Sequence, residues 1–345
     1  MNNKKILIIC CALLICILLS SCNNIDYITK DEGIIDVAFH WNMIGIVSTK
    51  GNCYVKGPVS NNNNYGLEEV PSSSFRCDNF MCIYNKGDAV SISLSRYGGI
   101  IINEMNDVYI FVNCSQKYSS PTLLCNGYVQ AYFWDKDHIY LLSQNGDFGY
   151  VTLDDPTNFN RIGNNVSKFI VDVKNASAQH TLFALTKNNR LYILSADEVM
   201  SKSSGFINGI TDFDLVVPHT ELCVFTLKDE HSNSYLCMGN YDLSFESLSD
   251  KSKYIQCNNN TALLASYRNG AATLDSSGNV AIYGSEPHYS NDDNDYFDYN
   301  GEILFTKANG IYGGIFNLIV TFEDGHYECF GRNSYNNQYT YFHNN

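Results

Sequence analysis

The stretch NLIVTFEDGHYECFGRN (residues 317–333) reads as two short strands joined by the turn Asp324-Gly325. Asp-Gly suits a two-residue type I′ turn, in which both central residues need positive φ. On both sides of the turn apolar and polar residues alternate, as in Val320, Thr321 and Phe322. A period of two around a tight turn predicts a β-hairpin.

The same pattern recurs along the chain. The turn positions taken from the sequence are Gly51, Asp107, Gly146, Asn189, Asn233, Gly278 and Gly325. They are 39 to 56 residues apart, with a mean of about 46, and a β-rich repeat of this length is typical of propeller blades. A two-layer β-sandwich would also contain such hairpins. The apolar residue two positions after the turn and the small residue six positions after it recur in the clearest copies, and they favour an all-β, seven-bladed β-propeller.

These repeats resemble the regulator-of-chromosome-condensation repeat, whose units read H-(t/s)-L-a-L-t-x-(D/N)-G-x-(V/L)-Y-x-x-G. The matching units are residues 180–195, 317–331 and 45–57. The resemblance spans about residues 33–345 and implies a seven-bladed propeller closed by an N-terminal strand in the last blade. The chain departs from the pattern by lacking most of the family's glycines.

The functions known in that family differ widely. They include nucleotide exchange on small GTPases, ubiquitin ligation and, in a secreted bacterial member, inhibition of β-lactamases. The sequence contains no residue set that would carry any of these activities. The resemblance therefore implies a fold and leaves the function open.

The N-terminus has the pattern of a bacterial lipoprotein signal. Two lysines precede an apolar run of 14 residues (residues 6–19), which is shorter than the roughly 20 residues that span a bilayer. Leu19-Ser20-Ser21-Cys22 follows and reads as a lipobox, which predicts lipidation of Cys22. An ordinary secretory signal with a chance cysteine is the alternative. We expect a signal peptide (1–21), a tether (22–32) and a propeller domain (33–345), located outside the cytoplasm at the membrane or cell surface.

The charge balance restricts the partners. Removal of the signal leaves 20 basic residues against 36 acidic ones, a net charge of −16. Nucleic acid and anionic membrane surfaces need a basic face, so neither is an expected partner. The acidic surface favours basic partners or cations, and we expect a monomer.

Nine of the 13 cysteines lie beyond the signal and the lipid site. An exported chain can form disulfides, and Cys223 and Cys237 lie symmetrically about the turn near position 230, which makes them a candidate pair. Free, buried thiols are the alternative. No cysteine or histidine cluster has the spacing of a zinc site.

The sequence contains no catalytic signature. Nucleophile elbows, metalloprotease motifs and nucleotide-binding loops are all missing, and no cofactor is expected. His180, and similarly His138, occupies the position at which the family uses a histidine to bond the backbone between blades. The acidic loop with Asp293, Asp295 and Asp298 offers oxygen ligands for a hard cation, but a solvated loop is the preferred interpretation and no metal site is expected.

We therefore expect a non-enzymatic, membrane-anchored propeller that binds a macromolecule, a protein rather than a glycan, through its inter-strand loops. Tyrosine, with 25 copies in the chain, offers rigid contact area for such binding. Two alternatives remain open. One is a propeller-scaffold hydrolase or lyase acting on polysaccharide through convergent carboxylates. The other is a structural envelope component without a discrete ligand.

Overall fold

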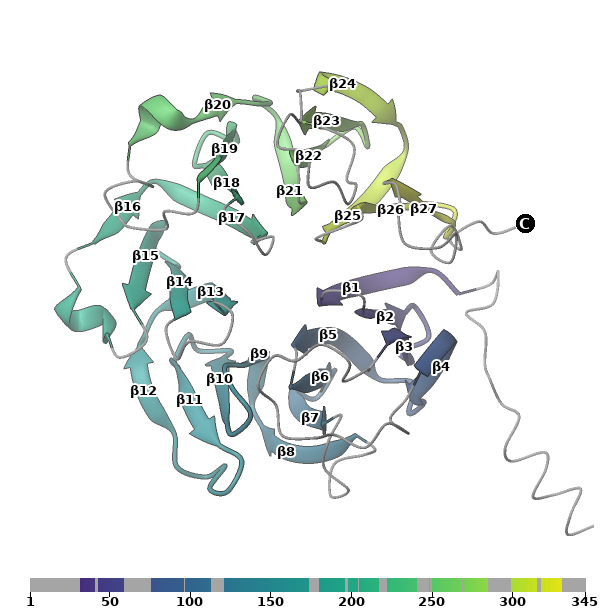
Figure 1. Cartoon of the computed structure of the whole chain (residues 1–345), viewed down its shortest axis with the longest axis vertical. Helices are drawn as coiled ribbons and strands as arrows, with labels where there is room; N and C mark the ends of the chain where they lie inside the picture. The colour runs from purple at the N-terminus through teal and green to yellow at the C-terminus, as the bar shows by residue number, and fades with distance from the viewer. Residues whose placement is uncertain are drawn as a thin grey trace, which may run out of the picture.

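The computed structural model describes residues 32–40, 43–58, 76–95, 97–112, 121–173, 180–195, 198–203, 205–216, 222–240, 248, 250–267, 270–284, 299–314 and 318–330. In these residues the chain forms seven antiparallel sheets, which follow one another around a central axis (Figure 1). The protein is an all-β, seven-bladed β-propeller, as the repeats predict.

Each of the first six blades has four strands, which pair in the order of the sequence. The strands of blades 1 to 4 are β1 (Ile34–His40), β2 (Met43–Ser48), β3 (Cys53–Pro58), β4 (Arg76–Tyr84), β5 (Ala89–Ser95), β6 (Gly98–Asn103), β7 (Asp107–Val112), β8 (Thr122–Asn126), β9 (Tyr128–Phe133), β10 (His138–Ser143), β11 (Phe148–Thr152), β12 (Asn160–Gly163), β13 (Val166–Val173), β14 (His180–Thr186), β15 (Arg190–Ser195) and β16 (Phe206–Asn208).

Blades 5 and 6 continue the pattern, and blade 7 has three strands among the described residues. Their strands are β17 (Ile210–Val216), β18 (Leu222–Asp229), β19 (Ser234–Asn240), β20 (Ile255–Gln256), β21 (Thr261–Tyr267), β22 (Gly270–Asp275), β23 (Val280–Gly284), β24 (Tyr299–Phe305), β25 (Ala308–Gly313), β26 (Leu318–Phe322) and β27 (Tyr327–Phe330). Among the described residues, two short 3₁₀ helices, η2 (Met200–Lys202) and η3 (Lys251–Lys253), lie between strands.

Every hairpin between the second and third strands of a blade turns on one residue with positive φ. These residues are Gly51, Asn106, Gly146, Asn189, Ser232, Gly278 and Gly325. Five coincide with the turn positions taken from the sequence, and Asn106 and Ser232 precede the expected Asp107 and Asn233 by one residue. In each case the amide of this residue donates to the carbonyl three positions earlier.

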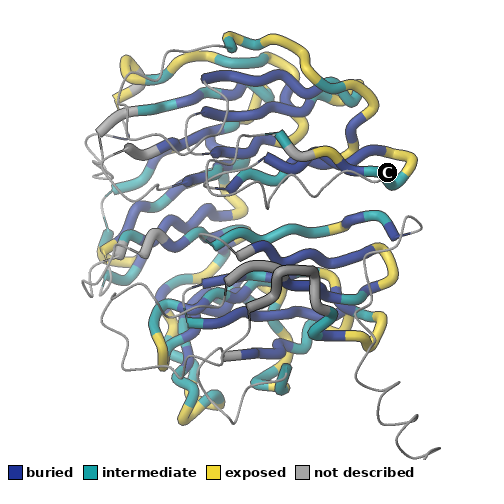
Figure 2. Tube along the Cα trace, turned by 45° about the vertical axis from the view of Figure 1, so that its right-hand side comes forward, coloured by how far each residue is buried: buried dark blue, intermediate teal, exposed yellow. Residues whose placement is uncertain are grey.

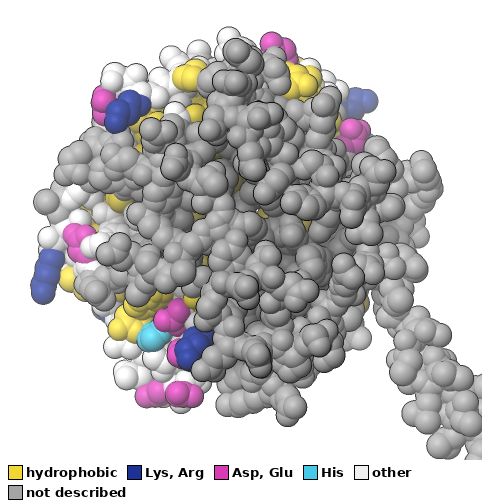
Figure 3. Space-filling view, viewed as in Figure 1, with side chains coloured by type: hydrophobic (Ala, Val, Ile, Leu, Met, Phe, Trp, Pro, Cys, Tyr) yellow, Lys and Arg dark blue, Asp and Glu magenta, His cyan; other side chains and the backbone are white. Residues whose placement is uncertain are grey.

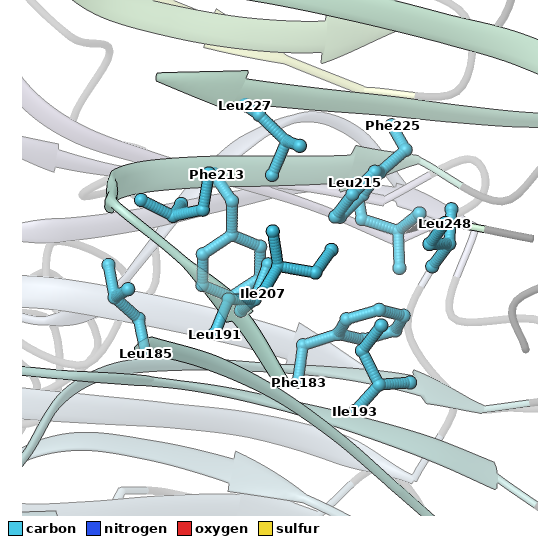
Figure 4. Packing of buried hydrophobic residues seen from close by; sticks show 11 residues of the cluster. Phe183, Leu185, Leu191, Ile193, Ile207, Phe213, Leu215, Phe225, Leu227 and Leu248 are labelled. Carbon is cyan, nitrogen blue, oxygen red and sulfur yellow. The ribbon is translucent and has the colours of Figure 1, made fainter. Parts of the chain in front are cut away.

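In the described part of the chain the core consists of seven apolar clusters, one at each interface between neighbouring blades. Between blades 4 and 5, Phe183 meets Phe213 and Phe225 at ring-centroid distances of 6.2 and 5.6 Å (Figure 4). Buried residues run along the strands while the turns are exposed (Figure 2). Because both faces of a sheet are covered by its neighbours, a blade depends on the complete ring for its stability.

Backbone hydrogen bonds join consecutive blades. The carbonyl of the hairpin turn accepts a bond from the first strand of the following blade, as in Ala89 N–H to Gly51 O at 3.0 Å and Val166 N–H to Gly146 O at 3.0 Å. The same bond recurs at all six junctions from blade 1 to blade 7. The turn residue therefore both reverses the chain and positions the next blade.

The ring closes between blades 7 and 1 by packing of side chains. Ile34, Ile44 and Ile46 of blade 1 meet Ile319 and Tyr327 of blade 7. β1 belongs to the first sheet, and within the described residues the seventh sheet holds no N-terminal strand. The sequence analysis expects an N-terminal strand in the last blade without assigning its residues, and residues 1–31 lie outside the described part of the chain, so that pairing stays a prediction.

Candidate interaction surface

The two ends of the ring differ in their connections. One end, the turn face, carries the seven hairpins between second and third strands together with the crossings from one blade to the next. The other end, the loop face, carries the connections between first and second strands and between third and fourth strands. Connections on the loop face vary more in length, and in blade 3 they lie wholly within described residues 121–173.

On the turn face, polar side chains form hydrogen bonds to backbone amides of their own hairpins. In six blades a side-chain oxygen three residues before the positive-φ residue accepts an amide just after it; these acceptors are Ser48, Asn103, Ser143, Thr186, Asp229 and Asp275. Asp229, for example, accepts from the amides of His231 and Asn233, both at 2.9 Å. These polar residues hold turns in shape and contribute chiefly to structure.

Blade 3 carries a row of aromatic side chains toward the loop face. Tyr140 lies opposite Tyr150 on one side and opposite Tyr132 on the other. Since alternate residues of a strand share a face, Trp134 and His138 form the next row toward the loops. We call the partly exposed residues Tyr132, Trp134, His138 and Tyr150 the blade-3 patch.

The rings of the blade-3 patch stack on one another and on the core. Trp134 is parallel to buried Tyr140, with centroids 5.2 Å apart and planes 9° apart. His138 lies 4.9 Å from Trp134, and Tyr150 meets Trp134 edge to face at 5.5 Å. Such contacts hold the aromatic surface in one arrangement.

A tight turn fixes the histidine of the patch. Asp135 accepts bonds from the amides of Asp137 and His138 at 2.8 and 2.7 Å, and both of its oxygens lie 2.9 Å from His138 Nδ1. The expectation for this position was a bond to the backbone between blades. In the structure, the Nδ1 atom of His138 bonds to the carboxylate of Asp135 within its own hairpin. In Figure 3, hydrophobic side chains lie beside a histidine and acidic side chains over the third blade.

A second set of polar residues links the innermost strands. The inner edge of each first strand has no neighbouring strand, so its backbone groups need other partners. Side chains of the adjacent blade supply them: Asp36 accepts from Ile92 N–H at 2.9 Å, Asp214 accepts from Ser266 N–H at 2.6 Å, and Lys168 donates to Phe213 O at 2.7 Å.

These inner carboxyl groups are engaged in the structure. Burial raises the pKa of Asp36 to about 6, against the lowering effect of its bonds from the Ile92 and Val37 amides. Burial likewise raises the pKa of Asp214, opposed mainly by the charge of Lys168. Lys168 also pairs with Asp212 at 2.8 Å. Their partners give Asp36 and Asp214 a role in joining blades.

Most of the predicted site residues are not tested by the structure. Cys22 and the acidic residues Asp293, Asp295 and Asp298 lie outside the described residues. Among the residues that are described, no group of histidine, cysteine and acidic side chains could hold a metal ion. Within the same residues there is no helix long and apolar enough to cross a bilayer.

The structure does not test the candidate disulfide. Cys237 lies opposite Phe225, while Cys223 lies opposite Gly239. The two cysteines therefore occupy diagonal positions across β18 and β19. The side chain of Cys223 is outside the described part of the structure, so this disulfide stays a prediction.

The blade-3 patch was not identified from the sequence, although His138 was singled out for another role. Its members come from three strands and from the turn that follows β9, and only the pairing register brings them together. The sequence does contain a spacing that could have indicated the patch: Tyr132 and Trp134, and then His138 and Tyr140, lie two residues apart and so on one face of a strand.

Comparison with known proteins identifies the fold and no closer relative. No protein-family profile matches the sequence, and no curated protein matches it significantly. Three solved structures illustrate the structural similarity. Human WBSCR16 has a TM-score of 0.55 and 11% identity, over 85% of this chain and 87% of the other. Prp20p from Saccharomyces cerevisiae, described with its binding to Gsp1p and histones, has a TM-score of 0.50 and 13% identity, over 83% and 81%.

A chain of the mitotic checkpoint complex has a TM-score of 0.52 and 10% identity, over 87% of both chains. At these identities the similarity shows a shared propeller architecture. It agrees with the repeat-type propeller that the sequence resembles.

Proposed function

We propose that this protein is a non-enzymatic propeller, anchored to a membrane through a lipid on Cys22, that binds a protein partner with the blade-3 patch. The observation that carries the proposal is the partly exposed aromatic patch at the loop-face end of blade 3, where Tyr132, Trp134 and Tyr150 pack against the core between blades 3 and 4. Rigid aromatic side chains contribute large contact area at a low cost in conformational entropy, which is why they are enriched at protein interfaces.

A protein partner is preferred to a glycan by analogy. Prp20p was described together with protein partners, and another of the similar propellers is part of a multiprotein complex. The proposal of a non-enzymatic role rests on the sequence, which contains no catalytic signature. The inner carboxylates that the structure describes have structural roles. Asp36 and Asp214 accept backbone bonds between blades, and Asp212 pairs with Lys168, so each has a structural partner.

Capture of the partner tests the binding role. The detergent-solubilised full chain is immobilised and incubated with membrane extract from the cells that produce it. We expect one stoichiometric protein that binds the wild type and Tyr150→Phe, and that binds Tyr150→Leu weakly, because leucine removes the ring from the patch. Circular dichroism verifies that both variants are folded. Equal capture by all three chains contradicts the proposed site.

The anchor is tested separately. Cys22→Ala removes the thiol that would form the thioether to lipid, and we expect the variant to accumulate with its signal uncleaved and without lipid. Mass spectrometry of the N-terminus distinguishes the forms. An unchanged, lipidated product, or an ordinary secreted one cleaved at another site, contradicts the anchor.

A further inference from the structure

We propose that the blade-3 patch selects a basic segment of its protein partner, with an arginine side chain stacked on the aromatic surface and neighbouring carboxylates pairing with its charge. This inference rests on the proposed function and assigns the chemistry of the partner. It depends on two loops of blade 3 that adjoin the patch.

The first observation is the charge at this end of the blade. The turn after β9 contains Asp135, Lys136 and Asp137, and the connection after β11 contains Asp154 and Asp155. A backbone bond from Leu153 N–H to Asp137 O at 2.8 Å holds the two connections together. Four carboxylates and one lysine therefore lie beside one aromatic surface.

The second observation is that two of these carboxylates remain available. Asp135 is committed to His138, and Asp155 accepts a bond from the Thr157 hydroxyl at 2.8 Å. Asp137 is 58% exposed and has only a loose contact with Lys136 at 3.8 Å, and Asp154 is exposed. These two acids present negative charge without an internal role.

The combination of rings and carboxylates matches a guanidinium group. Arginine stacks on the faces of Trp and Tyr, and its fork of N–H donors pairs with carboxylates. Its long apolar stem covers apolar surface while its charged end stays near water. The chain as a whole is strongly acidic, so attraction of a basic partner agrees with its overall charge.

The test uses hexa-arginine as the probe and hexa-glutamate as its opposite, with binding to the solubilised full chain measured by fluorescence anisotropy. Asp137→Asn/Asp154→Asn removes two charges beside the patch. Glu104→Gln/Glu230→Gln removes two exposed charges on the turn face and is the matched control. Tyr150→Leu and Tyr150→Phe remove and retain the ring.

We expect hexa-arginine to bind and hexa-glutamate not to bind. The Asp137/Asp154 variant should lose about threefold to tenfold in affinity, because exposed ion pairs are individually weak, and the turn-face variant should stay close to wild type. Tyr150→Leu should weaken binding and Tyr150→Phe should not. Rising salt should lower the affinity of the wild type more than that of the Asp137/Asp154 variant.

Several results overturn the inference. They are equal losses in the two charge variants, which would indicate attraction by net charge alone, wild-type affinity in Tyr150→Leu, or no binding of hexa-arginine. A protein partner that is captured by the wild type and lost with Tyr150→Leu, while the peptide shows one of these results, leaves the proposed function standing and removes the basic partner. If the wild type captures no protein partner and also fails to bind hexa-arginine, the proposed function is wrong as well.

Discussion

Asp36 makes the stability of the protein depend on pH. Its pKa is raised to about 6 from 3.8, so between these values the folded protein holds a proton that the unfolded chain has released. Asp36 therefore contributes most to stability below about pH 4, and this contribution is lost as the pH rises through 6. In Asp36→Asn the side chain no longer titrates and still offers an acceptor for the Ile92 amide.

We expect the free energy of unfolding of Asp36→Asn, relative to wild type, to increase by about 1 to 3 kcal/mol between pH 4 and pH 7. Urea denaturation at several pH values measures this difference. Because Asp214 titrates in both proteins, its contribution cancels. Parallel stability curves for the two proteins would show that Asp36 has no raised pKa.

Gly51 and Gly127 illustrate two different reasons why a position requires glycine: the backbone conformation and a close contact with a neighbouring segment. Both have positive φ, at 71° and 88°. A Cβ at Gly51 would lie 2.4 Å from the carbonyl carbon of Gly87, whereas one at Gly127 would meet no atom within 4 Å. We expect Gly127→Ala to cost about 1 kcal/mol for the backbone conformation alone, and Gly51→Ala to cost about 2 to 4 kcal/mol because blades 1 and 2 must also separate. Urea denaturation measures the free energy of unfolding of both variants, and equal losses would show that the contact of Gly51 with Gly87 adds nothing to the cost.

At the scale of the element, side chains of one blade satisfy the inner edge of the next. The amide of Gln130 on β9 accepts from Phe169 N–H at 3.0 Å and donates to Phe169 O at 2.7 Å on β13. Gln130→Leu keeps a similar volume and leaves both backbone groups without this partner.

We expect Gln130→Leu to destabilise the protein by about 2 to 4 kcal/mol, since each buried unpaired group costs about 1 to 3 kcal/mol. Ser93→Ala is the comparison, because the Ser93 hydroxyl serves only the Ala131 carbonyl, at 2.8 Å, and its loss should cost less. Thermal unfolding of the two variants ranks them, and a smaller effect for Gln130→Leu would argue against the inner-edge role.

The element scale also explains which parts could be predicted from the sequence. The hairpins can be predicted because turn chemistry is local. Two turn residues lie one position before the expected Asp107 and Asn233, because the side chains of Asn103 and Asp229 bond to the amides of Asp107 and Asn233 and leave Asn106 and Ser232 as the residues with positive φ. The blade-3 patch was not predicted, since it requires the register that sets Tyr140 opposite Tyr150. Register depends on packing between blades, and a single strand does not encode it.

For the whole molecule, the period of the repeat was enough to predict seven blades, because every sheet needs a neighbour on each face and the ring must close. Closure itself was predicted from the resemblance as a strand pairing. Among the described residues the seam is formed by side-chain packing, with one hydrogen bond from the Tyr312 hydroxyl to Ile35 O at 3.0 Å. The geometry of such a seam depends on the shapes of the packed side chains, and the hairpin pattern in the sequence does not predict how they fit together.

Gly314 and Phe39 provide a test of that seam. A Cβ at Gly314 in blade 7 would lie 2.5 Å from Cγ of Phe39 in blade 1, and the backbone of Gly314 does not need positive φ. We expect Gly314→Ala to destabilise the protein by about 1 to 3 kcal/mol through overpacking. Because each blade is supported on both faces, loss of stability at the seam should lower the unfolding midpoint of the whole ring.

Phe39→Leu should make room for the added methyl group, so the double variant should be more stable than the sum of the single effects predicts. Urea denaturation of the four proteins followed by circular dichroism and by tyrosine fluorescence measures this coupling, and strict additivity would place the two residues apart.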